Sequence, residues 1–298
     1  MELGFVGLGR MGFNMTLRLL RGGHRVVAYD LGAERTREAG TQGAVAAADL
    51  PALVRALAPP RALWLMLPAG EPTEATLAQL TPLLARGDLV VDGGNSNFHD
   101  DQRRAPRLAA AGIGYVDVGT SGGVWGLQNG YCMMAGGEPD AIARLAPALD
   151  TLAPPEGWLH TGPAGSGHYA KMIHNGIEYG LMQAYAEGFE ILQASEFRYD
   201  LGRLAHLWNQ GSVVRSWLLE LAERAFAADP RLERIRGWVD DSGEGRWTVL
   251  EALAHDVPAE VLTLALLRRF RSRQQDTFTD RVLAALRNEF GGHAVREK

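Results

Sequence analysis

Cysteine is almost absent from this sequence, because Cys132 is the only one among its 298 residues. A single thiol cannot form an internal disulfide, and one thiol without neighbouring ligands does not make a zinc site. The chain also lacks an apolar run of about 20 residues, the length that a membrane-spanning helix needs. Its start, MELGFVGLG, lacks the basic and then apolar order of a secretory leader. We therefore expect a cytoplasmic protein without a metal or a membrane partner.

An excess of basic charge is missing as well. Lys and Arg total 30 against 35 Asp and Glu, which gives a net charge of -5. This balance disfavours nucleic acid as a partner. Apolar residues make up 46% and charged residues 22% of the chain, as in ordinary globular proteins with room for one large or two medium cores.

The first half of the sequence alternates short apolar runs with segments of helix length. The runs are Glu2 to Gly7, Arg25 to Asp30, Ala62 to Leu67, Leu89 to Asp92, Tyr115 to Val118 and the weaker Tyr131 to Ala135, which precedes a helix starting near Pro139. Segments such as Asn14 to Leu20 and Gln102 to Ala111 are typical of helices. This alternation predicts a parallel sheet with helices on both faces.

The pattern changes at the turn-rich stretch Thr161 to Gly167. Beyond it, apolar residues recur at helical spacing and no strand pattern follows. The helical patterns are Tyr169 to Gln193, Leu201 to Phe226, Val249 to His255, Ala259 to Arg271 and Asp280 to Phe290. We predict a dinucleotide-binding domain over residues 1–164 and an all-helical domain for substrate binding and oligomerisation over residues 165–298.

A glycine motif joins the first expected strand to the first expected helix. Gly7 permits a tight turn, Gly9 lets the backbone approach a pyrophosphate, and Gly12 allows close packing of helix on strand. A turn that is merely rich in glycine is the alternative, but the strand and helix on either side favour the dinucleotide site. The predicted fold is therefore an α/β Rossmann-like N-terminal domain plus an all-α C-terminal domain. The cofactor loop consists of Gly7, Leu8, Gly9, Arg10, Met11 and Gly12.

Asp30 ends the second expected strand, close to the spacing at which an acid contacts the adenosine ribose. A carboxylate there would repel a 2′-phosphate, so we expect NAD as the cofactor. Arg35 and Arg37 follow, which keeps NADP open as a weaker alternative. The alternative is that Asp30 is only a solvated residue that opens a turn and does not contact the cofactor.

Two further strand ends should face the same crevice, because ligands of open α/β sheets bind at the carboxyl ends of strands. They are Leu67-Pro68 and Asp92-Gly93-Gly94-Asn95-Ser96. The Asn95 amide can donate and accept, which suits a nicotinamide or a substrate hydroxyl.

Four chemically active side chains share one face of the helix that follows residue 165. Lys171, His174, Asn175 and Glu178 stand at i, i+3, i+4 and i+7. The opposite apolar stripe is Ile173, Ile177, Leu181 and Ala184. A solvated polar face with one ion pair is the plain alternative, yet a cation, an imidazole, an amide and a carboxylate together favour a reactive site.

These residues resemble a known family, the 6-phosphogluconate dehydrogenases. The stretch GSGHYAKMIHNGIEYG (165–180) is similar to the family's signature, as are DGGNS (92–96) and Ser121-Gly122-Gly123. The end of the chain, RNEFGGH (287–293), resembles the family's RDxFGxH. At this length the chain looks like the shorter bacterial, NAD-type form.

The resemblance implies oxidative decarboxylation of 6-phosphogluconate to ribulose 5-phosphate, a reaction of the pentose phosphate pathway and of gluconate utilisation. Lys171 would be the general base at carbon 3, and burial beside the cationic nicotinamide would lower the pKa of its ammonium group. Glu178 would then protonate carbon 1 of the enediol that remains after loss of carbon dioxide.

The family's other site residues carry over onto matching positions. Asn95, Ser121, Gly122, Gly123, His174 and Asn175 would bind the sugar-acid end and the nicotinamide side. Tyr179 and Arg269 would bind phosphate, which a guanidinium fork matches well. Arg287 and His293 would come from a neighbouring subunit, which implies a homodimer or homotetramer with shared sites.

The chain departs from the family pattern in places and leaves two alternatives open. Ser242 to Trp247 reads SGEGRW where longer members have KGTGKW, and Val124-Trp125-Gly126 replaces an acidic pair. One alternative is a β-hydroxyacid dehydrogenase of the 3-hydroxyisobutyrate type, which does not decarboxylate and would give Glu178 no chemical role. The other is a module that senses dinucleotides without catalysis, which the Lys171 face argues against.

Overall fold

The computed structural model describes residues 1–296, apart from the side chain of Phe290. Its contacts divide the chain into two compact units, Met1–His174 and Asn175–Lys298. The division falls inside the helix α8, Ser166–Ala194, which begins just after the predicted boundary at residues 164 and 165. Helix α8 therefore starts in the first unit and continues in the second.

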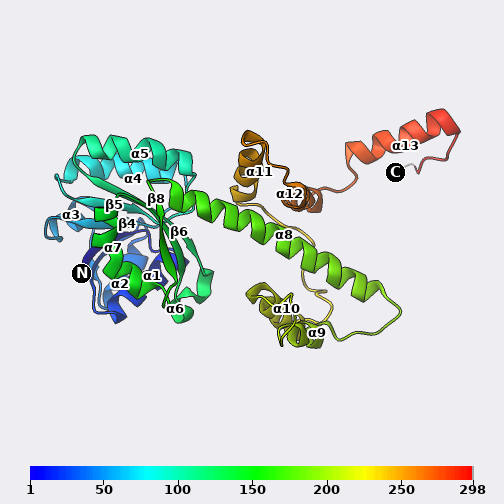
Figure 1. The fold of residues 1–298 in the computed structure, drawn as a ribbon, viewed down its shortest axis with the longest axis horizontal. Coiled ribbons are helices and arrows are strands. Elements are labelled where there is room, and N and C mark those ends of the chain that lie inside the picture. The colour runs from blue at the N-terminus through cyan, green and yellow to red at the C-terminus, as the bar shows by residue number, and fades with distance from the viewer. Residues whose placement is uncertain (297–298) are drawn as a thin grey trace. The chain divides into compact units, whose positions relative to one another are not determined.

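The first unit is built on one eight-stranded sheet of order β3-β2-β1-β4-β5-β6-β7-β8, of which Figure 1 labels β4, β5, β6 and β8. Its first six positions follow the order 3-2-1-4-5-6 of a dinucleotide-binding sheet, which confirms the predicted fold class. The strands are β1 Glu2–Val6, β2 Arg25–Tyr29, β3 Val45–Ala46, β4 Ala62–Leu65, β5 Leu89–Asp92, β6 Gly114–Ser121, β7 Cys132–Gly137 and β8 Trp158–Gly162.

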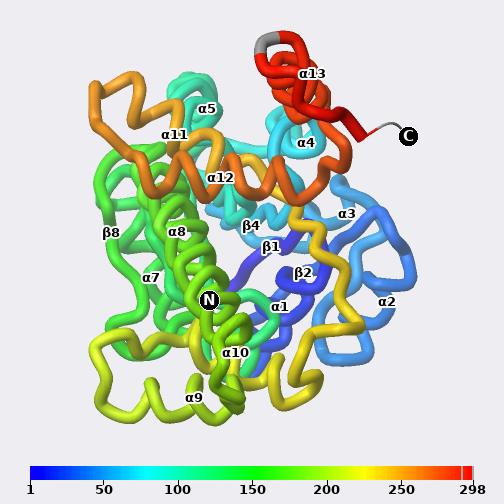
Figure 2. Tube along the Cα trace, turned by 90° about the vertical axis from the view of Figure 1, so that its right-hand side faces the viewer, coloured from blue at the N-terminus to red at the C-terminus, as the bar shows by residue number. Residues whose placement is uncertain are grey.

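Helices cover both faces of this sheet because the central strands bury side chains on both sides. Alternate residues of β1 show it: Phe5 belongs to the core under α1 and α7, and Val6 to the core under α3, α4 and α5. Figure 2 shows β1 beside β2, which pair in parallel. The helical elements are α1 Arg10–Arg21, α2 Ala33–Thr41, α3 Leu50–Arg55, α4 Glu71–Leu80, η1 Thr81–Leu83, α5 Phe98–Ala110, η2 Gly123–Trp125, α6 Gly126–Asn129 and α7 Pro139–Leu152.

One strand pair departs from the predicted parallel sheet. Strand β7 runs antiparallel to β6, whereas the other neighbouring pairs are parallel. The connection between them, residues 122–131, holds only η2 and the short α6. A parallel crossover needs a dozen or more residues, usually with a full helix. The chain therefore returns beside β6 in the opposite direction.

The second unit contains helices and no strand among its described residues, as predicted. Besides most of α8, they are α9 Leu201–Trp208, α10 Trp217–Ala228, α11 Glu244–Ala254, α12 Glu260–Ser272 and α13 Phe278–Gly291. The pattern Leu201 to Phe226 forms two helices, α9 and α10, which pack side by side (Figure 1, Figure 2). Gly211 interrupts it with a φ of +86°, a left-handed conformation that ends a helix. Within residues 1–296, no helix combines the length and apolar character needed to cross a membrane.

Helix α8 buries polar residues and exposes apolar ones, unlike a conventional amphipathic helix. Lys171, Asn175 and Tyr179 are buried, whereas Ile177 and Leu181 of the predicted apolar stripe are 51% and 45% exposed. Ordinary surface helices bury the apolar stripe and expose the polar one. Part of the polar face of α8 is therefore buried, with His174 and Glu178 half-buried, whereas Ile177 and Leu181 of the apolar stripe are left uncovered by the described chain.

Candidate active site

The glycine motif forms the predicted turn between β1 and α1. Gly7 has a φ of +94°, and a Cβ atom there would lie 2.3 Å from the carbonyl oxygen of Met66. A Cβ atom at Gly12 would lie 2.0 Å from the carbonyl oxygen of Gly7, so only glycine fits both positions. Space around Gly9 is open to 4 Å, and Arg10 and Met11 begin α1, whose N-terminus carries no side-chain cap. This loop fits a dinucleotide pyrophosphate.

Asp30 follows the end of β2 and holds the cofactor loop. Its Oδ2 accepts a hydrogen bond from the Leu8 amide at 2.6 Å, and its Oδ1 accepts one from the Gly32 amide at 2.7 Å. The Leu8 side chain is fully buried in the core, so this residue faces the loop only through its backbone. The predicted acid therefore lies at the nucleotide loop.

Leu67 and the loop after β5 lie next to the same turn. A Cβ atom at Gly7 would lie 3.0 Å from Cδ2 of Leu67, and one at Gly94 would lie 2.5 Å from the Leu67 carbonyl oxygen. Asp92 fixes this loop, because its carboxylate accepts hydrogen bonds from the Gly94 amide and the Ser96 hydroxyl. Asn95 is exposed between them.

Lys171 lies in the second turn of α8 and is only 6% exposed. Its Nζ is 3.3 Å from Nδ1 of His174. The helix rests on β6, which ends at Ser121, where Gly122 and Gly123 turn the chain with φ of +130° and +53°. The first unit therefore brings Lys171 and His174 together on one helix above the strand that carries the Ser121-Gly122-Gly123 loop.

In the second unit, α8 continues with Asn175, Glu178 and Tyr179. The Arg269 guanidinium stacks on the Tyr179 ring, 3.5 Å from its centroid, and donates to the Asp240 carbonyl at 2.8 Å. The Tyr179 hydroxyl accepts a hydrogen bond from the Ser242 amide at 3.4 Å. The structure thus brings the predicted phosphate residues Tyr179 and Arg269 together.

The neighbouring arginines are engaged differently from Arg269. Asp241 pairs with Arg246 at 2.7 Å and with Arg273 at 3.0 Å, and hydrogen bonds from these two arginines lower the pKa of Asp241. Among residues 1–296, no carboxylate pairs with Arg269, so its charge is left for an anionic ligand. Arg287 and His293 are exposed on α13 and just after it.

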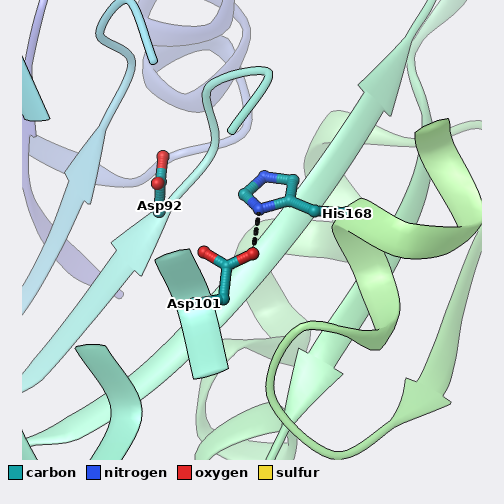
Figure 3. A group of neighbouring side chains, drawn as sticks. All are labelled: Asp92, Asp101 and His168. Carbon is teal, nitrogen blue, oxygen red and sulfur yellow. Dashed lines mark hydrogen bonds and ion pairs between the residues drawn. The ribbon is translucent and has the colours of Figure 1, made fainter. Parts of the chain in front are cut away.

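Sequence reasoning missed a cluster of buried charges at the start of α8 (Figure 3). Asp101 of α5 bonds Nδ1 of His168 at 2.7 Å and accepts a hydrogen bond from the Tyr115 hydroxyl at 2.7 Å. Arg104 donates to Asp92 at 2.7 Å and lies 3.6 Å from Asp101. Burial alone would lower the pKa of His168, but Asp101 raises it to about 9. The three residues drawn in Figure 3 have metal-ligand chemistry, yet the Arg104 guanidinium already supplies the positive charge there.

Comparison with known proteins places this site in a family. The model of the NAD binding domain of 6-phosphogluconate dehydrogenase matches residues 2–162, and that of the 6-phosphogluconate dehydrogenase C-terminal domain matches residues 167–294. An NAD(+)-dependent, decarboxylating 6-phosphogluconate dehydrogenase of Haloferax volcanii is 46% identical, over 100% of this chain and 99% of its own. YqeC of Bacillus subtilis, provisionally named as a 6-phosphogluconate dehydrogenase, is also 46% identical over the full length of both chains.

Solved structures agree with this assignment. Plasmodium falciparum 6-phosphogluconate dehydrogenase superposes with a TM-score of 0.84 at 27% identity, over 100% of this chain and 66% of that one. A 3-hydroxyisobutyrate dehydrogenase of Salmonella typhimurium shares the fold, with a TM-score of 0.73 at 22% identity over 91% and 93% of the two chains. The chain belongs to the 6-phosphogluconate dehydrogenase family and is an oxidoreductase that binds a nicotinamide dinucleotide.

Proposed function

We propose that this protein is an NAD-dependent, decarboxylating 6-phosphogluconate dehydrogenase that forms ribulose 5-phosphate and carbon dioxide. The observation that carries the proposal is the buried Lys171 on α8, with Glu178 two turns further along the same helix. A base and an acid on one helix face are what oxidation followed by decarboxylation requires. We place the reaction in the pentose phosphate pathway and gluconate utilisation of the cytoplasm.

Lys171 takes the proton of the carbon 3 hydroxyl while hydride leaves carbon 3. The bound dinucleotide supplies the hydride acceptor. The protonated Lys171 then donates to the carbon 3 ketone oxygen, so that electrons from the breaking bond to the carboxylate are drawn toward carbon 3. Glu178 delivers a proton to carbon 1 of the resulting enediol, while the now neutral Lys171 takes back the proton of the neighbouring enediol hydroxyl, which becomes the ketone of ribulose 5-phosphate. This sequence needs no metal, because the ammonium group polarises the ketone.

The remaining residues bind the two ends of the substrate. Asn95, Ser121, Gly122, Gly123, His174 and Asn175 hold the sugar-acid end and the nicotinamide side, and Tyr179 with Arg269 holds the phosphate. The unneutralised charge of Arg269 supports this role, because a guanidinium binds phosphate oxygens in pairs. Asp30 at the cofactor loop supports NAD, with NADP as a weaker substitute.

A homodimer or homotetramer completes the site with Arg287 and His293 of a neighbouring subunit. Large apolar side chains that are at least 45% exposed support an assembly: Ile177 and Leu181 of α8, Val261 and Leu264 of α12, and Leu283 and Leu286 of α13. Mixing two inactive variants, Lys171→Met and Arg287→Met, tests the shared site. Activity should return if subunits exchange, and mixtures that stay inactive after exchange would contradict it.

The decisive experiment for the substrate compares kcat/KM for 6-phosphogluconate and gluconate, each with NAD and with NADP. We expect a large preference for the phosphorylated acid with NAD. The SGEGRW segment in place of KGTGKW keeps a 3-hydroxyisobutyrate-type activity as the second candidate, and equal or absent activity on the phosphorylated acid would favour it. Retained turnover in Lys171→Met would remove the lysine as base.

A further inference from the structure

The start of helix α8 is capped by a carboxylate from a strand rather than by a residue of its own turn. Asp117 lies on β6 and is fully buried. Its Oδ1 accepts a hydrogen bond from the Gly165 amide at 2.6 Å, and its Oδ2 accepts one from the His168 amide at 2.8 Å. Two amides at a helix N-terminus, which have no partner within the helix, are thereby satisfied. Asp117 thus joins α8 to the sheet at one point.

The same helix end lies directly on the backbone of β6 and β7. A Cβ atom at Gly167 would lie 2.4 Å from the carbonyl oxygen of Met134 and 2.8 Å from that of Asp117. One turn further along, a Cβ atom at Gly119 would lie 2.3 Å from Cβ of Lys171. Gly119 and Gly167 contribute no side chain between helix and sheet, so the position of the first turn of α8 sets how close Lys171 lies to β6.

A second contact attaches the start of α8 to helix α5. His168 bonds Asp101 through Nδ1 at 2.7 Å (Figure 3), and both residues are fully buried or nearly so. Through Arg104 this pair connects to Asp92, which holds the loop that carries Asn95. Asp117 holds the backbone amide of His168 and Asp101 holds its ring Nδ1, so α8 is attached at this residue in two directions, which restrains its rotation about its axis.

We propose that Asp117 and His168 are positioning residues that fix Lys171 for catalysis. Asp117 sets the depth of the helix on the sheet, and His168 sets its rotation against α5. Neither residue needs to touch the substrate, because a base displaced by about 1 Å can cost about 100-fold in rate. This proposal rests on the proposed function insofar as Lys171 is the base.

Hydrogen exchange of the amides of residues 168–171 tests the positioning without any substrate. Asp117→Asn replaces one of the two accepting oxygens by an NH2 group, which cannot accept a hydrogen bond from the backbone N–H that faces it. Hydrogen exchange should therefore become faster at this helix start. In the same variant kcat should fall by about 100-fold, while the Kd for NAD stays within about twofold of wild type because the cofactor loop is untouched. The deuterium isotope effect on hydride transfer should rise.

Asp200→Asn is the matched control, because Asp200 also caps a helix, α9, through the amide of Arg203. It should leave kcat, the isotope effect and exchange at residues 168–171 unchanged. A second pair of variants serves if Asp117→Asn does not fold. His168→Leu should slow turnover, and His168→Gln, which still donates to Asp101, should restore part of it.

Unchanged exchange in Asp117→Asn, or a kcat within about threefold of wild type in both Asp117→Asn and His168→Leu, would overturn the proposal. Equal loss of kcat in His168→Leu and His168→Gln would also overturn the role of the His168 hydrogen bond. Failure of the wild-type protein to oxidise 6-phosphogluconate would refute the proposed function instead. Hydrogen exchange at residues 168–171 in Asp117→Asn would then still show whether Asp117 fixes the start of α8.

Discussion

Gly119 of strand β6 lies directly beneath Lys171 of helix α8, so closely that a Cβ atom at Gly119 would be 2.3 Å from Cβ of the lysine. Real Cβ atoms do not approach each other that closely, and the nearby Gly167 carbonyl, at 2.8 Å, is backbone that cannot swing away. The absence of a side chain at Gly119 therefore determines how near Lys171 lies to β6.

Replacing Gly119 by alanine should displace Lys171 and lower kcat by about 100-fold or more. Affinity for NAD, measured by fluorescence titration, should change little, because the cofactor loop lies on other strands. Gly188→Ala is the control, since nothing lies within 4 Å of a Cβ atom there, and it should keep wild-type kcat. Normal turnover of Gly119→Ala would show that Lys171 does not depend on this contact.

The choice of cofactor should depend on Asp30. Asp30→Ser removes the carboxylate that would repel a 2′-phosphate, so the ratio of kcat/KM with NAD to that with NADP should fall by about tenfold, or about 1.4 kcal/mol. Asp49→Ser, which removes a helix-capping carboxylate in the same unit, should leave the ratio unchanged. An unchanged ratio in Asp30→Ser would show that Asp30 does not determine the choice between NAD and NADP.

Phosphate recognition should depend on Arg269 and not on its neighbour. Arg269→Met should raise KM for 6-phosphogluconate by at least about tenfold and alter KM for gluconate much less. Arg268→Met changes an exposed arginine next to it in the chain and should leave both values unaltered. Equal effects of Arg269→Met on the two acids would place the phosphate site elsewhere.

Stability should fall with rising pH because of His168. Its pKa in the folded protein, about 9, lies above the unfolded value of about 6.5. The favourable interaction with Asp101 is therefore fully present below pH about 6.5 and is lost as pH rises to about 9, by up to about 3 kcal/mol.

Urea denaturation at several pH values across this window checks the prediction. Burial raises the pKa of Asp117 only to about 6, and that of Tyr115 far above its usual range, so neither titrates inside the window. His168→Gln should flatten the dependence. A slope that is the same in both proteins would assign it to other groups.

Most of the fold could be predicted from the sequence because local signals agreed with the final arrangement. Continuous apolar runs such as Leu89 to Asp92 predicted buried strands, and Gly7 to Gly12 predicted the strand, turn and helix that the structure contains. The position of Asp30 beside the glycine loop was predicted from its distance along the sequence from that motif. Lys171 and His174 were brought together by helical periodicity.

What the sequence did not reveal depends on contacts between distant segments. The short β8, Trp158–Gly162, has no fully buried residue and therefore no strong apolar signal. Asp101 and His168 are 67 positions apart, and no local pattern predicts that they pair inside the protein. Ile177 and Leu181 of the apolar stripe on α8 are exposed, because helical periodicity does not tell what covers a helix face.

We propose that Lys171 and Glu178 carry out an oxidation followed by decarboxylation. The most direct test measures NADH and carbon dioxide in one reaction of the wild-type protein with 6-phosphogluconate and NAD. We predict that the two products form in equal amounts, with ribulose 5-phosphate as the third. NADH formed without carbon dioxide would contradict the claim and indicate a β-hydroxyacid dehydrogenase.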